Sequence, residues 1–141
     1  MKISAFLIIF FPSLMLSQSL EKHLWKDRVL LIIADSYDYL LVQQQLQELS
    51  SNRRSLEERK LVIYQVTPTS YRFGITDDET NKNQILYKNY NPSKDPFIIL
   101  LLGLDGGVKM SSNKLLSSKQ IFKHIDQMPM RIQELRSKKK S

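Results

Sequence analysis

The residues best placed for chemistry are four polar side chains that directly follow a strongly apolar run. They are Asp35, Ser36, Tyr37 and Asp38, and the apolar run covers residues 28–34. Two carboxylates three positions apart can divide the roles of general acid and general base. Ser36 can act as a nucleophile only beside a positioned base. The same residue types also cap the first turn of a helix, and capping is the interpretation that we favour.

The chain offers little to activate such a nucleophile or to hold a metal ion. It has two histidines. We expect His23 to lie in a mobile leading segment and His124 to flank the apolar side of a late helix. The acidic run 77–79 would point in different directions around a helix, and no group of His, Asp and Glu has the spacing of metal ligands. We therefore predict no catalytic residue, no metal site and no cofactor.

The absence of cysteine removes a further set of activities. Thiol redox chemistry, cysteine nucleophiles and thiolate metal sites all require a thiolate. The sequence thus favours a protein that is not an enzyme. A cysteine-independent enzyme with a pocket at the start of the first helix stays open as the alternative.

The first 19 residues have the three-part pattern of a signal peptide. Lys2 precedes an apolar run over residues 3–16, and small polar residues follow. The run is too short for a membrane-spanning helix, which needs about 20 apolar residues. We predict cleavage after Ser19, with cleavage after Ser17 as the second choice. The mature protein would then be periplasmic or secreted, with no membrane span.

The formal net charge is +7, and much of the excess lies at the C-terminal end. Residues 131–141 form a tail with a single acidic residue, Glu134; its basic residues are Arg131, Arg136, Lys138, Lys139 and Lys140. A basic tail can contact anionic glycans, lipid headgroups or nucleic acid, and export makes nucleic acid an unexpected partner. We favour a solvated, frayed terminus that includes Arg131.

The elements that must position these residues can be predicted from apolar periodicity. Residues 28–34 are continuously apolar after Arg28, and residues 61–66 are rich in β-branched apolar side chains, so both stretches predict buried strands. Asp35 and Ser36 are expected to cap the helix between them, and a capping box at 55–58 is expected to open one further short turn. A crossover of this length joins parallel strands.

The second half predicts a loop, a helix, a third buried strand, a hairpin with an edge strand, and a closing helix. They are expected at residues 71–74, 76–88, 96–102, 105–110 and from 117 onward. Capping boxes at 76–79 and 117–120 are expected to open the two helices.

The resulting order, β-α-β-α-β-β-α, resembles the thioredoxin core. The resemblance implies one α/β domain over residues 20–130, with helices on both sides of a mixed sheet. Thioredoxins carry their two cysteines in the turn after the first strand, here residues 35–38, and a cis proline at the head of a later strand. Asp95 and Pro96 resemble that second segment and are expected to face the turn. Pro96 is either cis or an ordinary trans proline at a strand start.

Two short stretches resemble a narrower family. Residues 105–109 and 125–134 are similar to the C-terminal signature of the DUDES domain, a family of unknown function with small exported bacterial members and extracellular animal relatives. The resemblance covers residues 28–134 and implies export, but no activity. Leu104 and Met110 depart from the pattern, because basic residues are usual there, whereas Lys109 and Arg131 remain.

The sequence therefore predicts an exported, non-catalytic module that binds another protein or a cell-surface component. Its candidate pocket contains residues 35–38 with Asp95 and Pro96. Binding of an anionic glycan or lipid through the tail is a further alternative.

Overall fold

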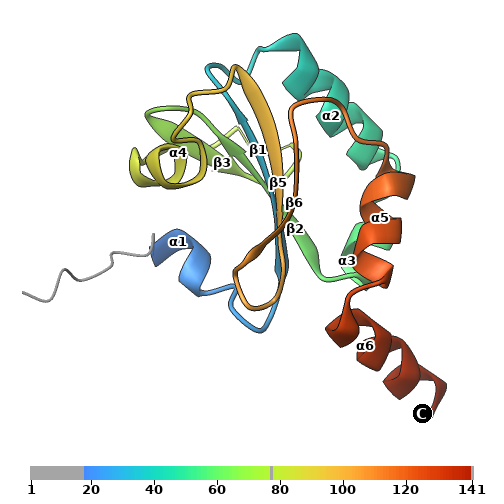
Figure 1. The fold of residues 1–141 in the computed structure, drawn as a ribbon. Coiled ribbons are helices and arrows are strands. Elements are labelled where there is room, and N and C mark those ends of the chain that lie inside the picture. The colour runs from blue at the N-terminus through green and yellow to red at the C-terminus, as the bar shows by residue number, and fades with distance from the viewer. Residues whose placement is uncertain (1–17, 77, 141) are drawn as a thin grey trace, which may run out of the picture.

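A six-stranded mixed sheet forms the centre of the protein (Figure 1). The computed structural model describes residues 18–76 and 78–140, so residues 1–17 of the predicted signal peptide lie outside it. The strand order is β4-β3-β2-β1-β5-β6. The strands are β1 (Arg28–Ala34), β2 (Leu61–Val66), β3 (Ser70–Phe73), β4 (Asn81–Lys82), β5 (Phe97–Leu102) and β6 (Val108–Ser112).

Strand β1 is the central strand of the sheet. It pairs with β2 in parallel and with β5 in antiparallel orientation. All seven of its residues are buried; the apolar sequence of residues 29–34 predicts this for six of them, and the seventh is Arg28. Because side chains alternate along a strand, Leu30 and Ile32 face one core while Leu31 and Ile33 face the other.

Three helices cover the first face of the sheet: α2 (Leu40–Ser50), α3 (Arg53–Glu58) and α5 (Ser118–Asp126) (Figure 1). Their buried side chains, among them Leu49, Ile121 and Ile125, join one cluster with the strands. The predicted capping box of α5 is confirmed, since Ser117 accepts from the Gln120 N–H and the Gln120 side chain accepts from the Ser117 N–H. The three helices thus pack directly on the apolar side chains of this face of the sheet.

The second face has much shorter cover, provided by α1 (Gln18–Glu21) and α4 (Ile85–Tyr90) (Figure 1). Its core contains aromatic side chains, including the buried Tyr64 and Tyr87. No helix of the described residues is long and apolar enough to cross a membrane.

The predicted helix at residues 76–88 is wrong in its first half. Thr76 and residues 78–80 lie outside any helix, and α4 begins only at Ile85. The oxygen of Asn83 accepts the Ile85 and Leu86 N–H groups and starts the helix there. The predicted loop at 71–74 is also wrong, because three of its residues belong to β3.

Two predicted caps are wrong as well. Helix α2 begins at Leu40, after Tyr39, so neither Asp35 nor Ser36 caps it. Helix α3 begins after Asn52, upstream of the predicted box at 55–58. Before α2 the Ser36 hydroxyl oxygen accepts the Asp38 N–H, and before α3 the Asn52 N–H donates to the Leu49 carbonyl oxygen, so the chain turns through local hydrogen bonds ahead of each helix.

The C-terminal segment is a helix, α6 (Pro129–Lys139), that runs away from the sheet beyond α5 (Figure 1). The expectation that Arg131 is solvated is wrong, because its side chain is only 1% exposed. Its guanidinium group binds carboxylates of Asp126, Glu134 and Glu58 at 3.2, 3.2 and 3.3 Å. Carboxylates from α3, α5 and α6 therefore hold Arg131, and with it the first turn of α6, against the body of the protein.

Candidate functional site

The polar cluster predicted at residues 35–38 lies at the carboxyl end of β1 and is mostly exposed. The oxygen of Ser36 accepts the Asp38 N–H at 3.2 Å, which makes a local turn. The Tyr37 hydroxyl bonds Ser70 at 2.7 Å, and the Arg72 guanidinium lies over the Tyr37 ring at 3.9 Å. These contacts fix the loop but place no base beside Ser36.

Asp95 and Pro96 do lie beside this turn, as predicted, because Ala34 pairs with Phe97 in the sheet. Burial, with the nearby Asp35 and Asp95 carboxylates, raises the pKa of Tyr87. The described residues contain no cis peptide bond, so Pro96 is trans.

The side chain of Asn91, and not a cis proline, fixes the backbone just before β5. Its side chain bonds both backbone polar groups of Asp95 at 3.0 Å.

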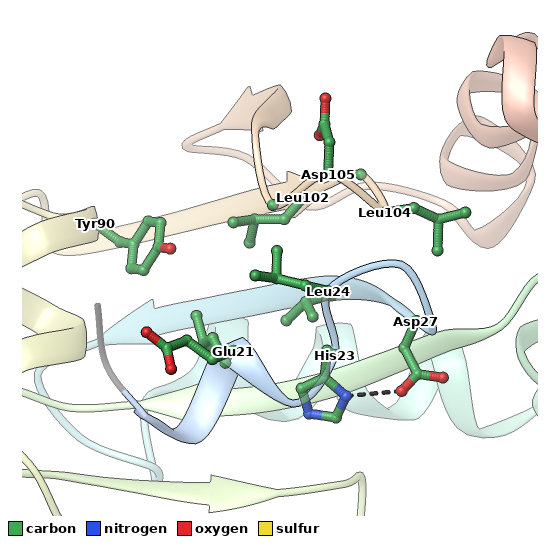
Figure 2. A pocket seen from close by; sticks show the side chains of 12 residues that line it. Glu21, His23, Leu24, Asp27, Tyr90, Leu102, Leu104 and Asp105 are labelled. Atoms are coloured by element: carbon green, nitrogen blue, oxygen red, sulfur yellow. Dashed lines mark hydrogen bonds and ion pairs between the residues drawn. The ribbon is translucent and has the colours of Figure 1, made fainter. Parts of the chain in front are cut away.

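A more enclosed site lies at the opposite end of β1. It is a pocket of about 170 Å³ on the second face of the sheet. Figure 2 shows Leu24, Leu102 and Tyr90 directed toward one another across it. Its apolar wall is completed by Leu20, Val29 and Leu104. The pocket therefore joins the leading segment, the start of β1, the end of β5 and the end of α4.

The turn after β5 shapes one wall of this pocket. Gly106 has a φ of 80°, a conformation that L side chains rarely adopt, and a Cβ there would lie 2.8 Å from Leu24 Cδ2. Asp105 is held ionised at the rim, because hydrogen bonds from Lys109 and the Gly107 N–H lower its pKa. The predicted hairpin turn is thus confirmed, and it also supports Leu24.

Three polar residues form a hydrogen-bonded chain that connects the leading segment to β2, and the sequence analysis did not predict it. His23 Nδ1 lies 2.8 Å from Asp27 Oδ2, and His23 Nε2 lies 2.6 Å from the Tyr64 hydroxyl (Figure 2 shows the first contact). The carboxylate accepts only, so the proton of a neutral imidazole belongs on Nδ1 and Tyr64 donates to Nε2. Burial raises the pKa of Tyr64 far above its usual value, which keeps the hydroxyl protonated.

The expectation of a mobile His23 is therefore wrong. The ring is buried, lies parallel to Phe73 at 6.0 Å between centroids, and uses both nitrogens. Two sequence signals could have indicated this. His23 and Asp27 are four positions apart, a spacing that brings side chains together within a turn. Tyr64 stands in a buried strand, where a hydroxyl needs a partner.

A second buried polar group connects the tail helix to the sheet. Arg28 is 1% exposed and its guanidinium meets Glu134 at 3.2 Å. Although burial opposes ionisation of Glu134, the hydrogen bond from Arg28 lowers its pKa below the usual range. Burial likewise opposes ionisation of Asp126, and the hydrogen bonds from Arg59 and Arg131 lower its pKa. The described residues contain no group of acidic, histidine and cysteine side chains able to hold a metal ion.

The fold defines a thioredoxin-like protein without cysteine. The structure is similar to the crystal structure of the reduced 2-Cys peroxiredoxin of Plasmodium vivax, with a TM-score of 0.57 and 15% sequence identity over 81% of this chain and 72% of that one. At this identity the likeness concerns the fold alone. Residues 19–134 match the family described as Domain of unknown function (DUF4174), and the chain belongs to that family. No curated protein matches the sequence.

Proposed function

We propose that this protein is an exported, non-catalytic module that binds another protein by enclosing one apolar side chain of the partner in the pocket at the amino end of β1. The observation that carries the proposal is the pocket itself. Its volume of about 170 Å³ is close to that of cavities known to hold a single benzene ring. A protein interface commonly gains most of its binding energy from a few such buried anchors.

The surroundings of the pocket support the same function. Leu24 at its rim is 38% exposed and the adjacent Trp25 is 65% exposed, so apolar surface continues outward from the opening. The His23 ring is buried and its two nitrogens contact Asp27 and Tyr64, so it serves to hold the leading segment on the sheet. The exposed Asp35 and Ser36, at the other end of β1, have no base positioned beside them. Binding therefore fits this arrangement better than catalysis.

Export rests on the signal-peptide pattern of residues 1–19 and on the resemblance to the DUDES domain. Cleavage after Ser19 would leave Leu20, the first pocket-lining residue, as the first residue of the mature protein. N-terminal sequencing of protein recovered outside the cytoplasm should begin between residues 18 and 20. Recovery of Met1 in that fraction would contradict the proposal.

Peptide selection tests the pocket directly. Peptides displayed on phage and selected on residues 20–141 should share one leucine or aromatic residue. A Leu24→Phe variant should fill the pocket and weaken their binding about 10- to 100-fold, the worth of burying one apolar side chain. The matched control is Leu40→Phe, because Leu40 is 67% exposed in α2. Equal binding to both variants would exclude the pocket.

A further inference from the structure

A groove separate from the pocket lies between the leading segment and the tail helix. It has a volume of about 490 Å³ and opens along one side of α6. Trp25 and Lys60 face it from the body of the protein, with Leu104 between the groove and the pocket. The helix contributes residues three or four positions apart, which share one side; they are Met130, Gln133, Glu134, Ser137 and Lys138.

The backbone of the two body residues is strained. Among the described residues three that are not glycine have a positive φ, and two of them line this groove: Trp25 at 64° and Lys60 at 50°. Bulky side chains rarely adopt this conformation. Both residues are held there by backbone hydrogen bonds of 2.7 Å, from the Trp25 N–H to Leu104 and from the Arg28 N–H to Lys60. Strained residues that the surrounding structure holds in place gather at binding sites.

The side chain of Trp25 makes little stabilising contact with the rest of the protein. Its indole is 65% exposed and its ring N–H bonds no described residue. Gln133 and Ser137 on the opposite wall also make no side-chain hydrogen bond within the described chain. The groove therefore presents a flat apolar face and several polar groups ready for a ligand.

The charge of the groove favours an anion. The carboxylates of Glu58 and Glu134 are engaged by Arg131, which is buried beneath them. The ammonium group of Lys60 makes no direct ion pair within the described residues, although its charge helps to lower the pKa of Glu134, which lines the same groove. Beyond Lys138 the helix continues with exposed cations, and Arg136 adds another. Positive charge thus continues along α6 from the groove to the end of the chain.

We propose that this groove binds a strand of anionic polysaccharide. One face of a pyranose ring is lined by C–H groups and packs flat on an indole, while ring hydroxyls can bond Gln133 and Ser137. A carboxylate or sulfate on the sugar would face Lys60, and following residues of the strand would run toward the lysines of the tail. A flat membrane surface would not need a groove, and an unmodified acidic peptide lacks the rigid ring that suits an exposed indole.

The single tryptophan of the chain makes the test direct, because Trp25 lines the groove and its fluorescence responds to a ligand there. Residues 20–141 would be titrated with polygalacturonate, dextran sulfate, neutral dextran, polyglutamate and anionic phospholipid vesicles. We expect a shift in Trp25 emission with one or both anionic polysaccharides, and their relative affinity separates carboxylate from sulfate. Affinity should fall as salt rises, since screening acts over about 8 Å at physiological ionic strength.

Two lysine variants distinguish binding in the groove from nonspecific electrostatic attraction to a basic protein. Lys60→Gln should weaken polysaccharide binding at least fivefold, whereas Lys119→Gln, the same change on the exposed start of α5, should leave it within twofold. Trp25→Ala, measured by calorimetry, should abolish it. The proposal would be overturned by equal losses of affinity in the two lysine variants. It would also be overturned if neither anionic polysaccharide changed the Trp25 emission, or if polyglutamate or vesicles bound more tightly. None of these results depends on the apolar pocket.

Discussion

The two ends of β1 differ in where their polar side chains lie. At the carboxyl end Asp35, Ser36 and Asp38 are exposed; Ser36 accepts the Asp38 N–H, and Asp35 accepts a hydrogen bond from Tyr87 at 3.4 Å. At the amino end Arg28 and His23 are buried and bonded to residues distant in the sequence. Burying a charged or polar group is costly unless it is fully paired. The amino end, where we place both proposed binding sites, is thus the end at which buried polar contacts join distant parts of the chain.

The largest expected effect comes from breaking the buried ion network at that end. Arg131→Ala would remove a buried cation that binds the partly exposed carboxylates of Asp126, Glu134 and Glu58. It should lower the free energy of unfolding by about 1.5–3 kcal/mol, the range for hydrogen bonds to charged groups. Arg136→Ala, on the exposed side of the same helix, should change it by less than about 0.5 kcal/mol. Urea denaturation of both variants makes the comparison. Similar values would show that the tail is solvated after all.

The same network predicts acid sensitivity. The pKa values of Asp126 and Glu134 are lowered in the folded state, so their stabilisation is complete at neutral pH. It should be lost as the pH falls below about 4.5 and through the folded-state values, because the unfolded chain then binds more protons. Urea midpoints between pH 7 and pH 3 measure this loss. The slope should be shallower in Arg131→Ala.

A smaller effect is expected at the polar chain beneath the pocket. Tyr64→Phe removes the 2.6 Å hydrogen bond to His23 and should cost about 0.5–1.5 kcal/mol. Tyr90→Phe is the matched control, because its hydroxyl bonds no described residue, and it should cost less. If the two substitutions cost the same, the bond to His23 contributes nothing to stability.

The smallest effect is expected at the carboxyl end. Asp35→Asn and Asp38→Asn change exposed side chains and should each alter stability by less than about 0.5 kcal/mol. Peptide and polysaccharide binding should also stay within twofold of the unchanged protein. Loss of either binding activity in these variants would reverse the comparison between the two ends.

The strands were predictable because their signal is local. Residues 28–34, 61–66 and 97–102 are dense in buried aliphatic side chains, and the thioredoxin-like order of elements followed from their spacing. Helix starts were harder to place. The acidic run at 78–79 resembles a cap, yet the chain continues to β4 because Asn81 and Lys82 pair with β3. Tertiary pairing there outweighs a local preference.

The buried polar contacts at the amino end of β1 were missed for a related reason. Residues 35–38 are adjacent in the sequence, so their polar character is visible in one short stretch. His23 and Tyr64 are 41 positions apart, and Arg28 and Glu134 are 106 apart. Pairs so distant leave no periodic pattern, and a single sequence does not reveal them. The prediction of a pocket beside the first helix therefore stays untested as a function.

The pairing of β1 with β5 also has a consequence for how the chain matures. Val29 pairs with Leu102, so the central strand is synthesised long before the strand that covers its second edge. At 5–20 residues per second, the interval is several seconds. During that time an apolar strand has an open edge, which can pair with another chain. We expect newly made chains to be most prone to pair with one another in the interval before β5 emerges.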